Sequence, residues 1–82
     1  MTMTSAPEGP SETAERLIAL LRPFTPFAEA IIRRQAERAG IPLRLVNREH
    51  LTKLTPMIVL AAQTFIDPAD LAEIKWQLAR YQ

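Results

Sequence analysis

The chain contains no cysteine, one histidine and two glycines among its 82 residues. Without cysteine there are no disulfides and no thiolate ligands, and a single histidine does not supply the ligand set of a zinc site. Gly9 and Gly40 are too far apart to form a glycine-rich phosphate loop. The only possible catalytic partner near His50 in the sequence is its neighbour Glu49, so we expect His50 to pack against other residues or to cap a helix. We therefore expect a protein with no metal, no cofactor and no enzymatic activity.

Long apolar runs are also missing. The longest, from Met57 to Ala62, is far shorter than the roughly 20 residues that span a bilayer. Acidic side chains at Glu8, Glu12 and Glu15 stand where a secretory signal peptide would be basic. We therefore expect a cytoplasmic protein that has no membrane partner.

The composition that is present indicates one small globular domain. Apolar residues make up 48% of the chain and charged residues 23%, which is too apolar for a disordered protein. A chain of this length buries only about 60–65% of its unfolded surface, so a second domain is not expected. We predict a flexible N-terminal tail over residues 1–10, which are small and polar, and a single helical domain over residues 11–82.

Prolines divide the predicted domain into short helices. Ser11 is a suitable N-cap for a helix to about Leu21, which Pro23 ends. Three later helices begin where a threonine or an aspartate precedes proline, because proline lacks only an amide that is unpaired at a helix start. The three pairs are Thr25-Pro26, Thr55-Pro56 and Asp67-Pro68. We expect the helix after Pro26 to run to Ala39 and to end at Gly40.

The spacing of apolar residues predicts how these helices pack. The first helix has Ala14, Leu17, Ile18 and Leu21 on one face. The helix over residues 56–66 is apolar almost all round, so we expect it in the centre of the bundle. The predicted fold is all-α: a compact bundle of about five short helices with steep crossing angles.

Two interpretations fit residues 41–54. In the preferred one, a single helix begins near Leu43 and ends at Leu54, because Gly40 already supplies the turn before it. Arg44, Arg48 and Thr52 then form an exposed row. In the other, residues 43–46 are extended and Asn47 caps a short helix to Leu54.

The stretch over residues 35–51 contains a pattern of small and apolar residues. The pattern consists of Ala36, Gly40, Ile41 and Val46, followed by a polar Arg48. It resembles the helix-turn-helix of Lac-repressor-type DNA-binding regulators. Gln35 and Glu49 depart from that family's pattern, which usually has apolar residues there. A purely structural turn after Gly40 is the alternative interpretation.

The resemblance implies that the second helix of the motif lies in the major groove of duplex DNA. Arg44 and Arg48, with Thr52, would then contact base edges or phosphates. The charge layout agrees, since residues 33–53 carry six basic and two acidic residues while the segments on either side are net acidic. We expect further phosphate contacts, or else simple solvation, for four basic side chains in this region. They are Arg33, Arg34, Arg38 and Lys53.

A second likeness is carried by Pro23-Phe24, Arg33-Arg34, Glu37, Gly40 and the pattern Val46-Asn47-x-Glu49-x-Leu51. These residues resemble the small helical domain at the end of a light-independent protochlorophyllide reductase subunit. An arginine typical of that domain after its first aromatic cluster is absent here.

The last predicted helix, which ends near Tyr81, supports a different function. It has two apolar stripes on opposite sides. Leu71, Ile74, Leu78 and Tyr81 form the first stripe, and Ala69, Ala72, Trp76 and Ala79 form the second. Tryptophan is a frequent anchor of protein interfaces, and small residues let another helix approach closely. This face could bind a second copy or another helical protein, or it could pack against the first helix.

Overall fold

The structure is a computed structural model that describes residues 9–81, so the predicted tail lies almost entirely outside the described residues. Within that part the chain forms four α-helices and no strands. They are α1 (Glu12–Leu21), α2 (Ala28–Arg38), α3 (Leu51–Ala62) and α4 (Pro68–Tyr81), with short 3-10 turns at η1 (Leu43–Leu45) and η2 (Arg48–His50). The all-α fold is confirmed, with four α-helices where about five were predicted. None of these helices is long and apolar enough to cross a membrane.

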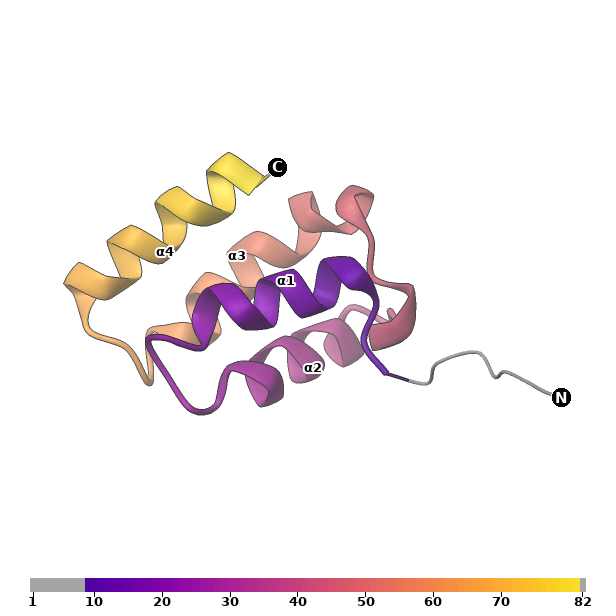
Figure 1. Cartoon of the computed structure of the whole chain (residues 1–82), viewed down its shortest axis with the longest axis horizontal. Coiled ribbons are helices and arrows are strands. Elements are labelled where there is room, and N and C mark those ends of the chain that lie inside the picture. Colours follow the sequence, from indigo (N-terminus) through magenta and orange to yellow (C-terminus); the bar gives the residue numbers. More distant parts are fainter. Residues whose placement is uncertain (1–8, 82) are drawn as a thin grey trace, which may run out of the picture.

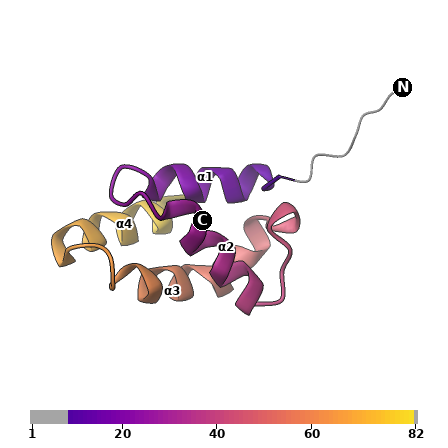
Figure 2. The same ribbon diagram turned by 90° about the horizontal axis from the view of Figure 1, so that it is seen from below.

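The four helices pack in a closed order (Figures 1 and 2). α1 contacts α2, α2 contacts α3, α3 contacts α4, and α4 returns to α1. Every helix therefore has one face toward a common core and another toward solvent. The largest fully buried side chains come from all four helices and from the loop after α2. They are Leu17, Leu21, Ile32, Val46, Leu51, Leu54, Ile58, Ile74 and Leu78.

The start of α1 is fixed by Ser11, as predicted. Its hydroxyl oxygen accepts a hydrogen bond from the Ala14 amide at 3.1 Å and donates one to the Val46 carbonyl oxygen. The Ser11 amide also donates to the Leu43 carbonyl oxygen at 3.2 Å. The four apolar residues predicted on this helix are all buried. Ser11 thus caps its own helix and holds the loop between α2 and α3.

The end of α2 agrees with the prediction that Gly40 ends this helix. Gly40 has a φ of 77°, and its amide donates to the Glu37 carbonyl oxygen at 3.0 Å. The Ile41 amide donates to the Ala36 carbonyl oxygen at 2.9 Å, which completes a Schellman motif. The start differs slightly, because α2 begins at Ala28 and the Thr25 hydroxyl accepts from the Phe27 amide in the turn before it.

The preferred interpretation of residues 41–54 is wrong. Leu43–Leu45 form only one 3-10 turn, and Val46 and Asn47 are extended. The carbonyl oxygens of Leu43 and Val46 both accept hydrogen bonds from Ser11. The Val46 carbonyl oxygen is therefore not available to an amide of a continuous helix. The Asn47 side chain accepts from the Glu49 amide at 2.9 Å, and His50 Nδ1 accepts from the Asn47 amide at 3.1 Å. The other interpretation is correct about the capping role of Asn47 and wrong about residues 43–45, which form a turn and are not extended. His50 is a capping residue, as expected.

The prediction for α3 also needs correction. The helix begins at Leu51 and passes through Pro56, which was predicted to start it. Its buried residues are confined to one side: Leu51, Leu54, Ile58 and Ala62. Leu60 is 67% exposed, so α3 lies at the surface and not in the centre. Each of the four helices has a side exposed to solvent, so none of them is enclosed by the other three.

Candidate functional site

The outer face of α4 consists of Ala69, Ala72, Trp76 and Ala79, all of them exposed. The opposite face, with Leu71, Ile74 and Leu78 buried, holds the helix to the core. Trp76 is 56% exposed although it is the largest apolar side chain in the protein and its only tryptophan. The outer face is therefore open to solvent and does not pack against α1.

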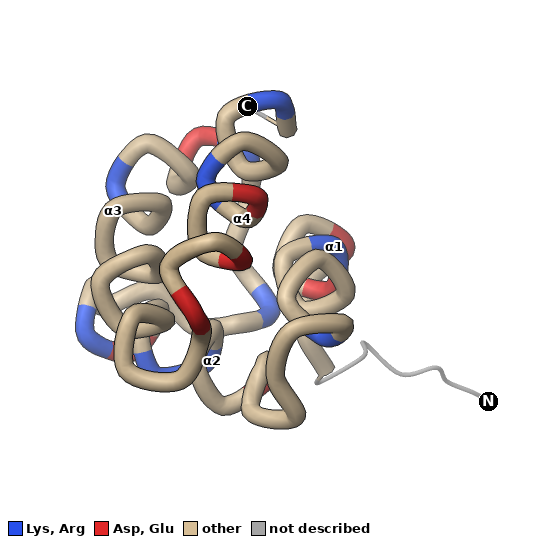
Figure 3. The backbone as a smooth tube through the Cα atoms, turned by 90° about the vertical axis from the view of Figure 1, so that its left-hand side faces the viewer, with Lys and Arg blue, Asp and Glu red and all other residues tan. Residues whose placement is uncertain are grey.

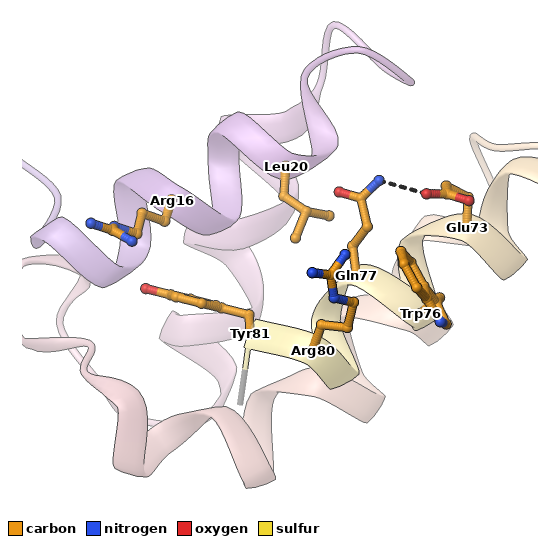
Figure 4. Close-up of a pocket in the computed structure, with 7 residues that line it drawn as sticks. All are labelled: Arg16, Leu20, Glu73, Trp76, Gln77, Arg80 and Tyr81. Atoms are coloured by element: carbon orange, nitrogen blue, oxygen red, sulfur yellow. Dashed lines mark hydrogen bonds between the residues drawn. The ribbon is translucent and has the colours of Figure 1, made fainter.

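The Trp76 ring is held at the surface by its neighbours on the same helix (Figure 4). The Arg80 guanidinium lies over the ring, 4.6 Å from the ring centroid. Gln77, the residue after Trp76, donates a hydrogen bond to a carboxylate oxygen of Glu73, one turn earlier along the helix, at 2.9 Å. A cation over an exposed aromatic ring stabilises its position by about 0.5–1 kcal/mol. Trp76 is thus an oriented side chain on a regular helix.

A groove of about 550 Å³ runs beside this face, between α1 and α4. Arg16 and Leu20 line it from α1, and Trp76, Gln77 and Tyr81 line it from α4 (Figure 4). Arg16 is paired with Glu12 on its own helix at 3.2 Å. The groove extends the outer face of α4 toward α1, so a partner docking on Trp76 would also meet polar groups.

Arg48 has a structural role that the sequence does not reveal. Its guanidinium donates to the Tyr81 carbonyl oxygen at 2.8 Å and lies 5.5 Å from the centroid of the Tyr81 ring. A cation at the C-terminal end of a helix is stabilising, because it satisfies a free carbonyl group and complements the helix dipole. The two residues are 33 positions apart, so only the folded chain brings them together.

The predicted recognition row is not formed. Arg44 lies on η1, Arg48 on η2 and Thr52 on α3, so the three side chains do not share a helix face. Arg33 forms an ion pair with Glu29 at 2.6 Å on the outer side of α2. Four other predicted contacts, Arg34, Arg38, Arg44 and Lys53, are exposed on three different elements. Figure 3 shows basic positions on the side of α2 and acidic positions along α4.

The structure also shows an apolar surface that the sequence analysis missed. Phe27 and Phe65 have ring centroids 5.3 Å apart, and both rings are about half exposed. They stand at one end of a groove of about 360 Å³ between α2 and the end of α3. The signal in the sequence is the apolar outer side of the helix over residues 56–66, which by itself predicts a central position for that helix.

Comparisons with protein-family models, with curated proteins and with solved structures find no match to this chain. The class that the structure defines is a small all-α domain with four packed helices.

Proposed function

We propose that the protein is a non-enzymatic interaction module that pairs with a second copy of itself through the outer face of α4. The observation that carries the proposal is the exposure of Trp76, held by Arg80 on a face whose other members are alanines. Half-exposed aromatic side chains of this kind are typical anchors of protein interfaces. Alanines beside them let the backbone of another helix approach closely.

The order of residues on this face suits an antiparallel pair. Ala72 and Trp76 are equally distant from position 74, and so are Ala69 and Ala79. A twofold axis beside position 74 therefore places each tryptophan opposite Ala72 of the other copy. Each tryptophan then meets a small residue and Ala69 meets Ala79, so the face is complementary to itself, as isologous interfaces require.

Charge supports the same arrangement. The acidic residues of this region, Asp67, Asp70 and Glu73, lie at the start of α4, and the basic ones, Lys75 and Arg80, lie in its second half. Antiparallel pairing sets the acidic half of one helix beside the basic half of the other. Exposed ion pairs contribute only about 0.2–1 kcal/mol each, and one helix per copy is a small contact. We therefore expect a weak dimer, with a Kd on the order of 100 μM.

Sedimentation equilibrium over a range of concentrations tests this proposal. The wild-type protein is expected to self-associate, and Trp76→Ala is expected to weaken the dimer at least about tenfold, because it removes the anchor. Leu60→Ala is the matched control, since Leu60 is even more exposed but lies on α3. A wild-type protein that is monomeric at about 1 mM, or equal losses in the two variants, would contradict the proposal.

Binding to duplex DNA stays a prediction from the sequence. Its proposed recognition helix is replaced by two 3-10 turns, and Arg48 is bonded to the end of α4. The exposed basic residues on α2 could still contact phosphates. Two of them, Arg34 and Arg38, also line the groove between α2 and α3, so a duplex competitor at low salt belongs in any binding experiment on that groove.

A further inference from the structure

The groove between α2 and α3 has the apolar lining of a peptide-binding site. Ala30 and Ile31 contribute from α2 and Ala61 from α3, while Phe27 and Phe65 stand together at one end. From Phe27 to Arg38, α2 lines the groove over about 17 Å, which corresponds to about three turns of helix. The groove thus has the length of a short amphipathic helix.

One side of this groove is positively charged. Arg34 and Arg38 are one turn apart on α2, and both line it. In contrast to Arg33, neither forms an ion pair within residues 9–81. No acidic side chain of this described part lines the groove. A partner with carboxylates along one edge of its apolar face would complement these arginines.

A largely buried glutamine that lines the groove suits the same partner. Gln35 is only 5% exposed and lines the groove between the two arginines in sequence. Its side chain makes no hydrogen bond to any residue in the described part of the chain, where no buried side-chain polar atom lacks a partner, so its amide atoms reach the open space of the groove. Because this amide is open to the groove, a group that enters the groove can accept a hydrogen bond from it. A carboxylate can accept from Gln35 and from an arginine together.

We propose that this groove binds an acidic amphipathic helix of another protein. Aliphatic side chains of that helix would cover Phe27 and Phe65, and its carboxylates would meet Arg34, Arg38 and Gln35. The proposed helix would lie between α2 and α3, in the manner of a helix-in-groove complex. This surface is made from α2 and α3, and so it is independent of pairing through α4.

The test uses a fluorescein-labelled helical peptide of about 14 residues, with leucines three and four positions apart and glutamates at the flanking positions. A matched peptide carries lysine in place of every glutamate. Fluorescence anisotropy is expected to show binding of the glutamate peptide and at least about tenfold weaker binding of the lysine peptide. The double variant Arg34→Ala and Arg38→Ala is expected to remove this preference. Arg33→Ala, on the outer side of α2, is the matched control.

Gln35→Leu provides a second and sharper variant. Leucine has a similar size and removes only an amide that makes no hydrogen bond within residues 9–81, so the fold is expected to be about as stable while the glutamate peptide binds about threefold more weakly. Trp76→Ala is expected to leave peptide binding unchanged, so that failure of this proposal and failure of α4 pairing can be distinguished.

Three results would overturn the proposal. The first is no binding of the glutamate peptide at about 1 mM. The second is equal affinity for the two peptides. The third is a labelled DNA duplex that binds more tightly than the glutamate peptide and depends on Arg34 and Arg38, because the surface would then serve nucleic acid.

Discussion

Gly40 is the residue whose backbone most directly fixes a local structure. Its φ of 77° is in the left-handed region, where residues with a Cβ atom are strained. The Schellman hydrogen bonds of the α2 terminus depend on this conformation. A Cβ atom at this position would meet no heavy atom within 4 Å, so any cost of substitution comes from the backbone alone.

Gly40→Ala is therefore expected to lower the free energy of unfolding by about 1 kcal/mol. Urea denaturation followed by circular dichroism measures this change. Gly9→Ala is the matched control, because Gly9 also has open space around it and shows no positive φ. Equal stability of the two variants would contradict the claim that a side chain at position 40 strains the backbone.

Two other single residues have a role in the fold that differs from the role that the sequence suggests. Gln35 departs from the helix-turn-helix pattern, and in the structure it is a largely buried residue that lines a groove together with two arginines. Arg48 looked like a DNA contact, and the structure makes it a cap for α4. Neither role has a local signal, because each depends on residues from a distant element.

At the scale of elements, the helices that were predicted well have local signals at their ends. Ser11 caps α1, Gly40 ends α2, and α4 begins at the pair Asp67-Pro68. The segment over residues 41–54 was mistaken because its backbone carbonyl groups bond to Ser11 on another element. Hydrophobic periodicity contains no information about such a bond.

Pro56 within α3 is the clearest conflict between a local preference and the fold. Its nitrogen cannot donate to the Thr52 carbonyl oxygen, and its ring crowds the preceding turn. Pro56→Ala is expected to raise the free energy of unfolding by about 1 kcal/mol, after the loss of the rigidity that proline gives the unfolded chain. The melting temperature should rise by about 4–8 °C.

Differential scanning calorimetry would measure this rise in melting temperature. Pro68→Ala is the control, because Pro68 is the first residue of α4, where a proline costs nothing. An unchanged or lower melting temperature for Pro56→Ala would mean that α3 tolerates its proline without strain.

At the scale of the whole molecule, closed packing of only four helices decides which apolar residues stay outside. The sequence shows that Trp76 and Leu60 are apolar, but it does not show that no other helix of residues 9–81 covers them. Their exposure follows from the order in which the helices contact each other. This order also places the α4 face and the α2–α3 groove on different helices, so the protein has two independent candidate surfaces.

Amide NMR spectra recorded over a concentration series test the central claim most directly, because they report every residue separately. If copies pair through α4, the signals of Ala69, Ala72, Trp76 and Ala79 should shift with concentration, including the indole N–H of the single tryptophan. The signals of Ala30, Arg34 and Ala61 in the α2–α3 groove should stay fixed. Shifts confined to that groove, or no shifts at all up to about 1 mM, would contradict pairing through α4.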